Sequence, residues 1–377
     1  MGGDVELTCR GCGSSRSTKV VDLGPQPASD FFPEADDPTV DGRWPLELWL
    51  CPDCALVQLG PIEALVPEPV RAVESATSLE HARRTVAAVL DEHPELVGSV
   101  VYEFASHHGG SWLDHLRGAG CRVADDGEKA RLVVDVHGLA HEQDIASCLA
   151  ERTERLSADG YLVLEFHHLL PLVLEDQFDT IRHGHWVYFS LTAVRNLAAA
   201  QGLTTLAATP EPVFGGSLRV LLAPTSSGRT PDASVAKVLA VEQSAGVAEA
   251  GALEALNRRA HAAAAELHTY VSAQVGAGRG VLAYGAPSKA AVLLGLSRIG
   301  PDLVPFTVDA SPAKHGLAIP GVRVPIRPVG ELVAARPPIV LVLTWDIADE
   351  VVGQLEASGG WGAEYVVPLP HPHPYAR

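Results

Sequence analysis

Short apolar runs alternate with helix-like stretches over most of the chain, a pattern typical of α/β proteins. Residues 62–95 are predicted to be helical, with VRAVESATSLEHARRTVAAVLDEH as the clearest amphipathic stretch. Between residues 99 and 224, the apolar runs SVVYEF, RLVVDVHGL, YLVLEF and LRVLLAP predict strands. A helix is expected over Leu191–Gln201, because Gly202 stands where a helix commonly ends.

The two ends of the chain differ from this middle part. Residues 1–60 combine short strands and turns with many prolines. The segment TSSGRTPDAS has the composition of a linker and precedes a long Ala-rich helical stretch over Ser234–Gln274. Beyond it, GVLAYG, LVPFTVDA and PIVLVLTW alternate with helices and predict a second, smaller Rossmann-like unit. The chain is therefore divided into residues 1–60, 61–98, 99–228 and 229–377.

Composition narrows the classes of partner and compartment. The 377 residues carry a formal net charge of −18, which argues against nucleic acid because phosphate-backbone binding requires a basic face. No apolar run reaches the roughly 18–20 residues of a membrane span, and no secretion signal is expected. A small-molecule substrate is the expected partner, with no nucleic acid and no membrane, in the reducing cytoplasm.

Four of the six cysteines form two CxxC pairs, Cys9-x-x-Cys12 and Cys51-x-x-Cys54. Two such pairs can close a tetrahedral thiolate site, and four thiolates leave no open position on the metal. We therefore predict a structural zinc ion; the alternative is four ordinary buried cysteines. The two remaining cysteines are expected to be core thiols: Cys121 and Cys148.

The stretch from Val101 to Asp144 resembles the start of a nucleotide-binding unit that is then cut short. Its first strand runs into a glycine turn and a helix, the order in which a Rossmann-type unit meets its cofactor. Only a few residues separate CRVAD from RLVVDVHGL, whereas a parallel crossover usually takes about a dozen residues or more. We expect a sheet with fewer than seven strands, in which Leu132–Val136 lies beside Val101–Phe104. The candidate cofactor-binding residues are Glu103, Gly109 and Asp125.

A carboxylate that ends the second strand of a nucleotide site binds ribose hydroxyls. Asp125 or Asp126 is the candidate here, and the alternative is that both are turn residues.

Several segments, in order along the chain, resemble the sugar C-methyltransferases of antibiotic deoxysugar pathways. They are MGGDVELTCRGCG, VVDLGPQPASDFF, RWPLELWLCPDCALVQL, QFDTIRHGHWVYFSL, FGGSLRV, AYGAPSKA, VDASPAKHGLAIPGVRVPI and TWDIADE. The resemblance implies an α/β fold with a small zinc domain (1–60), a helical connector (61–98), an abbreviated SAM-methyltransferase-like Rossmann domain (99–228) and a C-terminal Rossmann-like domain (229–377). It also implies methylation at C3 of a nucleotide-linked 4-keto sugar.

Some of the family's site residues are replaced. The turn after the first strand resembles E-x-G-x-N-D-G, but Ala105, His107 and His108 stand at its Gly, Asn and Asp positions. Arg182 and Gly184 replace the tyrosine and glutamate of the motif Y-H-E-H, and a family tyrosine expected near Ser75 is not found. These changes, together with the shortened sheet, make SAM a doubtful cofactor.

The resemblance implies acid–base roles for three histidines. His185 matches the family's base on the sugar carbon, His183 precedes it in the same motif, and His141 matches the segment N-V-L-A-H. The alternative for each is an ordinary polar residue. The region is rich in histidine, but no spacing specifies a second metal site. The candidate substrate-binding residues, or turn residues needed only for folding, are Ser288, Lys289, Asp309 and Lys314.

Three functions remain open at this point. The first is a repurposed, SAM-independent enzyme of secondary metabolism that isomerises, epimerises, eliminates or cyclises its substrate by base-assisted proton transfer. The second is a SAM-dependent C-methyltransferase with a compressed cofactor site. The third is a non-catalytic scaffold or partner of a pathway enzyme.

Overall fold

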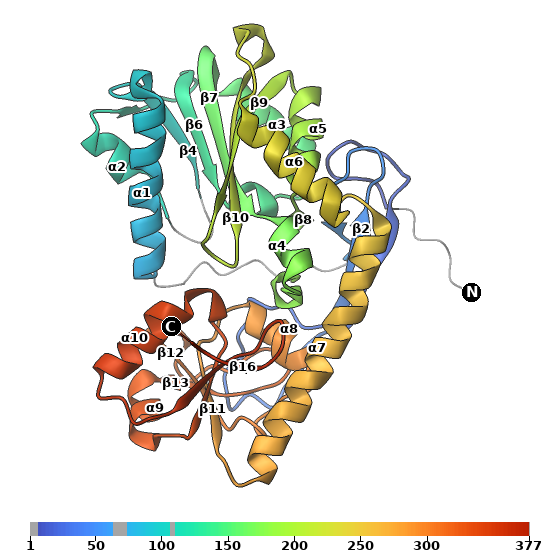
Figure 1. Ribbon diagram of the computed structural model, residues 1–377, viewed down its shortest axis with the longest axis vertical. Coiled ribbons are helices and arrows are strands. Elements are labelled where there is room, and N and C mark those ends of the chain that lie inside the picture. Colours follow the sequence, from blue (N-terminus) through green and yellow to red (C-terminus); the bar gives the residue numbers. More distant parts are fainter. Residues whose placement is uncertain (1–6, 63–73, 106–109, 377) are drawn as a thin grey trace.

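The computed structural model describes residues 7–62, 74–105 and 110–376 of the chain. A small N-terminal sheet lies beside two α/β units, one above the other in Figure 1, and the long helix α7 runs from the N-terminal sheet down along the lower unit. The α/β class and the three parts predicted from the sequence are confirmed. In the described residues, no helix combines the length and apolar character needed to cross a membrane.

The N-terminal sheet has the order β1-β2-β3-β8 and is antiparallel throughout. Its strands are β1 (Thr18–Gln26), β2 (Trp44–Leu50), β3 (Val57–Leu59) and β8 (Val187–Tyr188). Alternate residues of β2 are buried, as expected for a strand with one face on the core. The strand β8 belongs to the middle of the chain, so the N-terminal sheet is completed by a segment next to His185.

The central sheet has six strands in the order β5-β4-β6-β7-β10-β9. All run parallel except β10, which is antiparallel to both of its neighbours. Leu132 lies opposite Val101, as predicted, and the sheet has fewer than seven strands. The strands are β4 (Val100–Phe104), β5 (Arg122–Val123), β6 (Ala130–Val136), β7 (Leu156–His167), β9 (Leu203–Glu211) and β10 (Ser217–Pro224).

A short connection explains how this sheet is abbreviated. The strands β5 and β6 lie on opposite sides of β4, yet only residues 124–129 join them, and no helix lies between them. The crossing is short because β5 has just two residues. Val123 is level with Val101, and Val101 is level with Leu132, so the chain needs to return by only about two residues to start β6.

Helices cover both faces of the central sheet (Figure 1). Serine side chains cap the start of two of them: Ser75 accepts from the N–H of Ser78, and Ser190 accepts from that of Ala193. The α-helices are α1 (Ala76–Glu92), α2 (Leu113–Gly118), α3 (Ile145–Glu154), α4 (Leu169–Leu174) and α5 (Leu191–Ala200). The 3-10 helices are η1 (Pro94–Leu96), η2 (Leu139–His141), η3 (Phe178–Thr180) and η4 (Thr225–Ser227).

The predicted Ala-rich helical stretch consists of two helices. The first, α6 (Ala233–Ala245), ends at Gly246, which adopts a left-handed conformation with φ of 66°. The second, α7 (Ala250–Gly276), then continues toward the C-terminal unit. Glycine takes this conformation without the steric penalty of a Cβ atom, so it terminates the first helix.

The C-terminal unit is a second six-stranded sheet, in the order β13-β12-β11-β14-β15-β16. It is parallel apart from β16. Its strands are β11 (Val281–Tyr284), β12 (Thr307–Asp309), β13 (Ile326–Pro328), β14 (Ile339–Val342), β15 (Glu364–Val367) and β16 (His373–Pro374). Its helices are α8 (Lys289–Leu296), η5 (Pro312–Lys314), α9 (Val329–Ala335), η6 (Trp345–Ile347) and α10 (Ala348–Ala357).

Candidate functional site

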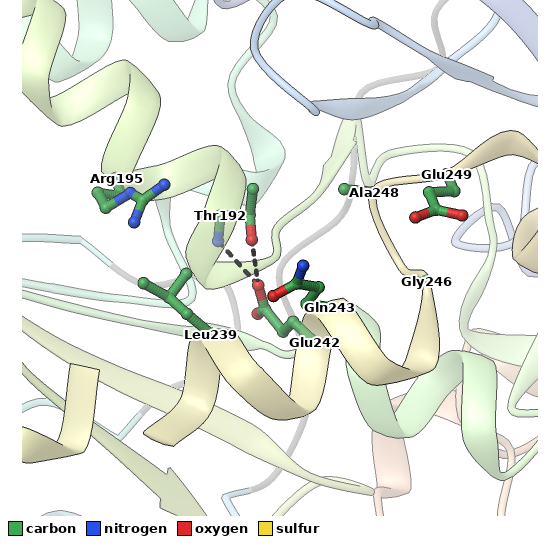
Figure 2. Close-up of a pocket in the computed structure, with 8 residues that line it drawn as sticks. All are labelled: Thr192, Arg195, Leu239, Glu242, Gln243, Gly246, Ala248 and Glu249. Atoms are coloured by element: carbon green, nitrogen blue, oxygen red, sulfur yellow. Dashed lines mark hydrogen bonds between the residues drawn. The ribbon is translucent and has the colours of Figure 1, made fainter. Parts of the chain in front are cut away.

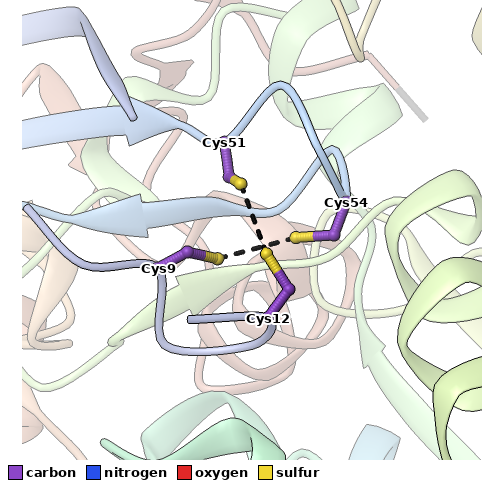
Figure 3. Close-up of side chains that lie close together, drawn as sticks. All are labelled: Cys9, Cys12, Cys51 and Cys54. Carbon is purple, nitrogen blue, oxygen red and sulfur yellow. Dashed lines mark hydrogen bonds between the residues drawn. The ribbon is translucent and has the colours of Figure 1, made fainter. Parts of the chain in front are cut away.

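The four predicted zinc ligands converge in the N-terminal domain (Figure 3). Cys9 Sγ lies 3.5 Å from Cys54 Sγ, and Cys12 Sγ lies 3.6 Å from Cys51 Sγ. Sulfurs bound to one tetrahedral zinc at 2.3 Å would stand about 3.8 Å apart. The donor set and its spacing therefore fit a closed zinc site, and among the described residues no other group of His, Cys, Asp or Glu gathers in this way.

Tight turns bring each cysteine pair together. Cys51 donates its N–H to Leu56 O at 2.9 Å and accepts the N–H of Ala55 at 2.9 Å. Cys9 makes equivalent contacts around its own turn, with distances of 2.8 and 2.9 Å. The cysteines outside the cluster differ from each other, because Cys121 is buried as predicted whereas Cys148 is only partly buried.

The candidate cofactor-binding residues Glu103 and Asp125 have different surroundings. Both oxygens of Glu103 accept hydrogen bonds at the start of α2, from Ser111 Oγ at 2.5 Å and from Trp112 N at 2.6 Å. The side chain of Asp125 is 91% exposed and lies in the β5–β6 connection, 3.6 Å from Arg122. Gly109 lies outside the described residues.

The folded chain brings His141 and His185 together. Their rings meet edge to face with centroids 4.4 Å apart, and Tyr188 lies 6.2 Å from His185. The two loops are joined by the N–H of Trp186, which donates to Ala140 O at 2.8 Å. His141 ends η2 just beyond the carboxyl end of β6, where ligands of parallel sheets commonly bind.

His183 is separated from this pair and faces the N-terminal domain. Its Nδ1 lies 3.1 Å from Pro27 O, and its Nε2 lies 3.1 Å from Pro45 O. Both ring nitrogens thus contact backbone carbonyls. These contacts give His183 a role in docking the N-terminal domain, whereas His185 lies against His141.

The neighbouring Arg182 is buried and forms an ion pair with Asp30 at 2.5 Å. Asp30 also accepts a hydrogen bond from Ser288 Oγ, so one carboxylate of the N-terminal domain links both α/β units. The neighbouring Lys289 forms an ion pair with Asp346. Two of the four predicted substrate-binding residues are therefore close to the junction of the three parts.

The other two hold the turn that follows β11. Asp309 accepts the N–H of Ala286 at 2.7 Å and that of Ser311 at 2.8 Å. Lys314 Nζ donates to Ala286 O at 2.7 Å and stands 3.9 Å from Asp309. These contacts fix the backbone beside Ser288, and a role in substrate binding remains a prediction.

A contact between the two α/β units involves Asp179 and Trp345, which no motif in the sequence marks as site residues. Trp345 Nε1 donates to Asp179 Oδ2 at 2.8 Å, and Lys289 Nζ lies 3.9 Å from the centre of the Trp345 ring. Burial raises the pKa of Asp179 to about 6, and Lys289 opposes this rise. A Cβ on Gly215 would lie 2.6 Å from the Trp345 ring, so only glycine allows the ring so close.

His167 is a second residue in this region that the sequence did not distinguish from its many neighbours. Its Nε2 lies 3.2 Å from Gln177 Oε1. Burial lowers the pKa of His167 to about 3, and the nearby His137 and Lys289 lower it further. The ring is therefore neutral at physiological pH.

The contact between Asp179 and Trp345 could not be predicted from the sequence. The two residues lie in the segments QFDTI and TWDIADE, which are 166 residues apart, and no local pattern connects them.

A pocket of about 270 Å³ lies elsewhere, between α5 and the α6–α7 junction (Figure 2). It is lined by Thr192, Arg195, Leu239, Glu242, Gln243, Gly246, Ala248 and Glu249. None of the predicted site residues lines it. The carboxylate of Glu242 accepts hydrogen bonds from the N–H and the hydroxyl of Thr192, so it serves the start of α5. We therefore place the candidate site at the His141–His185 pair and not in this pocket.

Comparison with known proteins adds evidence from both ends of the chain. Residues 9–64 match the family model described as "Putative zinc binding domain", and residues 212–370 match the model described as "C-methyltransferase C-terminal domain". C-methyltransferase NovU of Streptomyces niveus is 29% identical over 404 residues, which cover 97% of this chain and 96% of that protein.

Solved structures give weaker likenesses. The 1,6-didemethyltoxoflavin-N1-methyltransferase of Burkholderia thailandensis, solved with S-adenosylhomocysteine, is 14% identical with a TM-score of 0.30, covering 47% of this chain and 96% of that one. The magnesium protoporphyrin IX methyltransferase of Synechocystis is 13% identical with a TM-score of 0.29, covering 41% and 90%. TM-scores this low carry no conclusion about activity.

Proposed function

Because the chain belongs to the C-methyltransferase family that joins a zinc-binding domain to a C-methyltransferase C-terminal domain, we propose that it is an enzyme that keeps the family's proton-transfer chemistry and works without SAM. Its substrate would be a small keto intermediate of secondary metabolism, such as a nucleotide-linked keto deoxysugar. The reaction would be an isomerisation, epimerisation, elimination or cyclisation started by removal of a proton beside the carbonyl group.

The observation that carries this proposal is the β5–β6 connection. In nucleotide-binding sheets, the carboxylate at the end of the second strand binds ribose hydroxyls. Here that strand has two residues, the following residues 124–129 contain no helix, and the Asp125 side chain points into solvent. The carboxylate of Glu103 is also engaged, by Ser111 and Trp112. These features support a reaction without SAM, and we derive no step through it.

The proton-handling side of the family site is better preserved. His185 and His141 lie in edge-to-face contact, beside the carboxyl end of β6. Imidazole is suited to proton transfer near neutral pH because it can be populated in both its neutral and its charged form. The hydrogen bond from Trp186 N to Ala140 O joins the backbones that carry the two rings, which favours a fixed geometry.

The proposed reaction begins when a neutral imidazole, that of His185, accepts the proton bound to the carbon next to the carbonyl. The electron pair of the broken C–H bond forms an enolate, and the proton remains on the ring. An isomerase or epimerase then returns a proton to a different atom or face, so no oxidant or methyl donor is consumed. His141 is close enough to His185 to share the charge that develops there.

Two measurements test the proposal. Incubating the zinc-loaded protein with a nucleotide-linked 4-keto-6-deoxy sugar in D₂O, without SAM, should introduce deuterium at the carbon beside the carbonyl. Isothermal titration with SAM should give no binding in the low micromolar range. No deuterium incorporation would favour a non-catalytic partner protein.

The residue assignment has its own test. Replacing His185 with Ala should slow deuterium incorporation by roughly 10²–10⁴, the usual scale for losing a general base. The matched control is His261→Ala, an exposed histidine on α7 that binds Asp22 O at 3.0 Å. An unchanged rate for the His185 variant would remove that residue from the mechanism.

A SAM-dependent C-methyltransferase is the second candidate, and the relation to NovU over 97% of this chain favours it. The same experiment separates the two. Appearance of a C-methylated sugar on adding SAM, together with low-micromolar SAM binding, would support the methyltransferase and contradict our proposal.

A further inference from the structure

His137, the residue that follows β6, has a backbone conformation that histidine rarely adopts. Its φ is 57°, in the left-handed region, and strained residues of this kind cluster at functional sites. The surrounding turn holds it firmly. Its N–H donates to Glu165 O at 2.7 Å, and Asp135, anchored by Arg152 at 2.7 Å, accepts the N–H of Gly138 at 2.9 Å.

The carboxylate of Glu165 lies beside this ring. It is only 1% exposed, and its Oε1 is 2.6 Å from His81 Nε2 and 3.6 Å from His137 Nε2. Its Oε2 is buried without a hydrogen-bond partner in the described part of the chain. Burial would raise the pKa of Glu165, but the contacts with His137 and His81 outweigh it and lower the pKa to about 2. The group is therefore a buried anion.

His81 is held in one tautomer by its other neighbours. Its Nδ1 lies 3.5 Å from a guanidinium nitrogen of Arg84 and 3.4 Å from Thr85 Oγ1. A guanidinium only donates hydrogen bonds, so Nδ1 accepts and Nε2 carries the hydrogen that is donated to Glu165. The ring of Phe214 stands edge-on to both histidines, with centroids 6.3 Å from His81 and 5.4 Å from His137.

We propose that His137 is a second acid–base residue of this protein, and that Glu165 and His81 are the positioning residues that orient its ring. The inference rests on the proposed proton-transfer function and names a further group for it. A buried carboxylate beside an imidazole fixes the ring's orientation and stabilises the imidazolium that forms when the ring takes a proton. His137 directly follows β6 and His141 ends η2 four residues later, so both residues lie just beyond the carboxyl end of β6.

The chemistry explains why two groups are useful. An isomerase or epimerase must take a proton from one position and return one to another. His185 accepts the proton from carbon, and the C–H electron pair forms the enolate. The imidazolium of His137 then donates its proton to the second position. A proton moves from His185 to solvent and another from solvent to His137, which restores the starting state without any change in oxidation level.

The test uses the full zinc-loaded chain and the D₂O assay with the same nucleotide-linked 4-keto-6-deoxy sugar. His137→Asn should lower deuterium incorporation by roughly 10²–10⁴. Asn is the suitable replacement because it tolerates positive φ, so the turn should be kept. Glu165→Gln should lower kcat by at least about tenfold, leave KM nearly unchanged, and move the alkaline limb of the pH–rate profile to lower pH, because the proton-donating imidazolium has lost its anionic neighbour.

The matched control is Glu242→Gln, since Glu242 is an equally buried carboxylate 2.7 Å from His168. Its rate, measured on folded protein, should stay within about threefold of the wild type.

If His185→Ala is inactive while His137→Asn keeps full activity, the inference is overturned and the proposed function stands. If Glu165→Gln loses activity with an unmoved pH profile, the positioning role is overturned. If the wild-type protein exchanges no deuterium, the proposed function fails, and the inference fails with it.

Discussion

Glu165 and Glu242 are both buried and both lie beside a histidine, but their surroundings differ. Glu242 is 2.7 Å from His168 Nε2, and its two oxygens also accept hydrogen bonds from backbone N–H groups at the start of α5 and from a threonine hydroxyl. Glu165 is 2.6 Å from His81, but its second oxygen has no hydrogen-bond partner among the described residues.

This difference separates a structural carboxylate from a candidate functional one. A negative charge at a helix N-terminus is stabilised by the helix dipole and by unpaired N–H groups, and Glu242 accepts two of these N–H groups at the start of α5. An incompletely bonded buried carboxylate costs free energy, so its retention requires another explanation. Burial and a neighbouring histidine are thus insufficient evidence for a site, whereas an unsatisfied oxygen near strained His137 is more informative.

Loss of zinc should have the largest effect on stability, because it would disturb the fold that holds Glu165 and Glu242 in place. Cys51→Ser should lose the metal and cost several kcal/mol, since structural zinc contributes about 10–16 kcal/mol in small domains. The strand β3 follows the second cysteine pair and pairs with β8 next to His185, so the site should be affected too. Elemental analysis and thermal unfolding measure both effects, with Cys121→Ser as the control outside the cluster. Unchanged zinc content in the Cys51 variant would contradict the site.

The structural role of Glu242 can be measured directly. Glu242→Ala should lower the free energy of unfolding by about 3–5 kcal/mol, because breaking a buried pair leaves the histidine and the helix start without their acceptor. Denaturant unfolding gives this value. The exposed Glu249, on the rim of the same pocket, is a matched control whose replacement should change stability by less than about 0.5 kcal/mol. A similarly small effect of Glu242→Ala would mean that Glu242 has no structural role to set against Glu165.

The charge on Glu165 should appear in the pH dependence of stability. Its pKa is lowered from 4.5 to about 2 in the folded protein, so its contribution is fully present above pH ~4.5 and is lost as the pH falls toward 2. The lowering corresponds to roughly 3 kcal/mol. Unfolding titrations between these pH values should show this loss in the wild type and a smaller one in Glu165→Gln. Identical slopes would mean that the carboxylate is not held as an anion.

Ionisation of Asp179 should lower the stability of the folded protein, the opposite of the effect of Glu165, and by a smaller amount. Burial raises its pKa from 3.8 to about 6, so the folded state is penalised as the pH rises through this range and the carboxylate ionises. Asp179→Asn keeps an oxygen that can accept the hydrogen bond from Trp345, and should raise stability at pH 7 by about 1–3 kcal/mol. The exposed Asp126→Asn is the control. A variant that follows the wild-type pH curve would contradict the raised pKa.

The sequence alone determined three properties of this protein. The two CxxC pairs determined the metal site, because each pair supplies two thiolates from one turn and four thiolates complete the tetrahedral coordination of zinc. The alternation of apolar runs and helices determined the α/β class and the order of the three parts. The short gap between CRVAD and RLVVDVHGL determined that the central sheet is abbreviated, since chain length limits any crossover.

The tertiary structure alone decided which polar side chains meet. His81 and Glu165 are 84 residues apart, and Asp179 and Trp345 are 166 apart. It also separated His183 from His185, although only one residue lies between them, because the first ring docks on the N-terminal domain. Local patterns report backbone preference and the buried face of each element. The contacts of a polar residue depend on how distant elements pack, and no local pattern in one sequence encodes that packing.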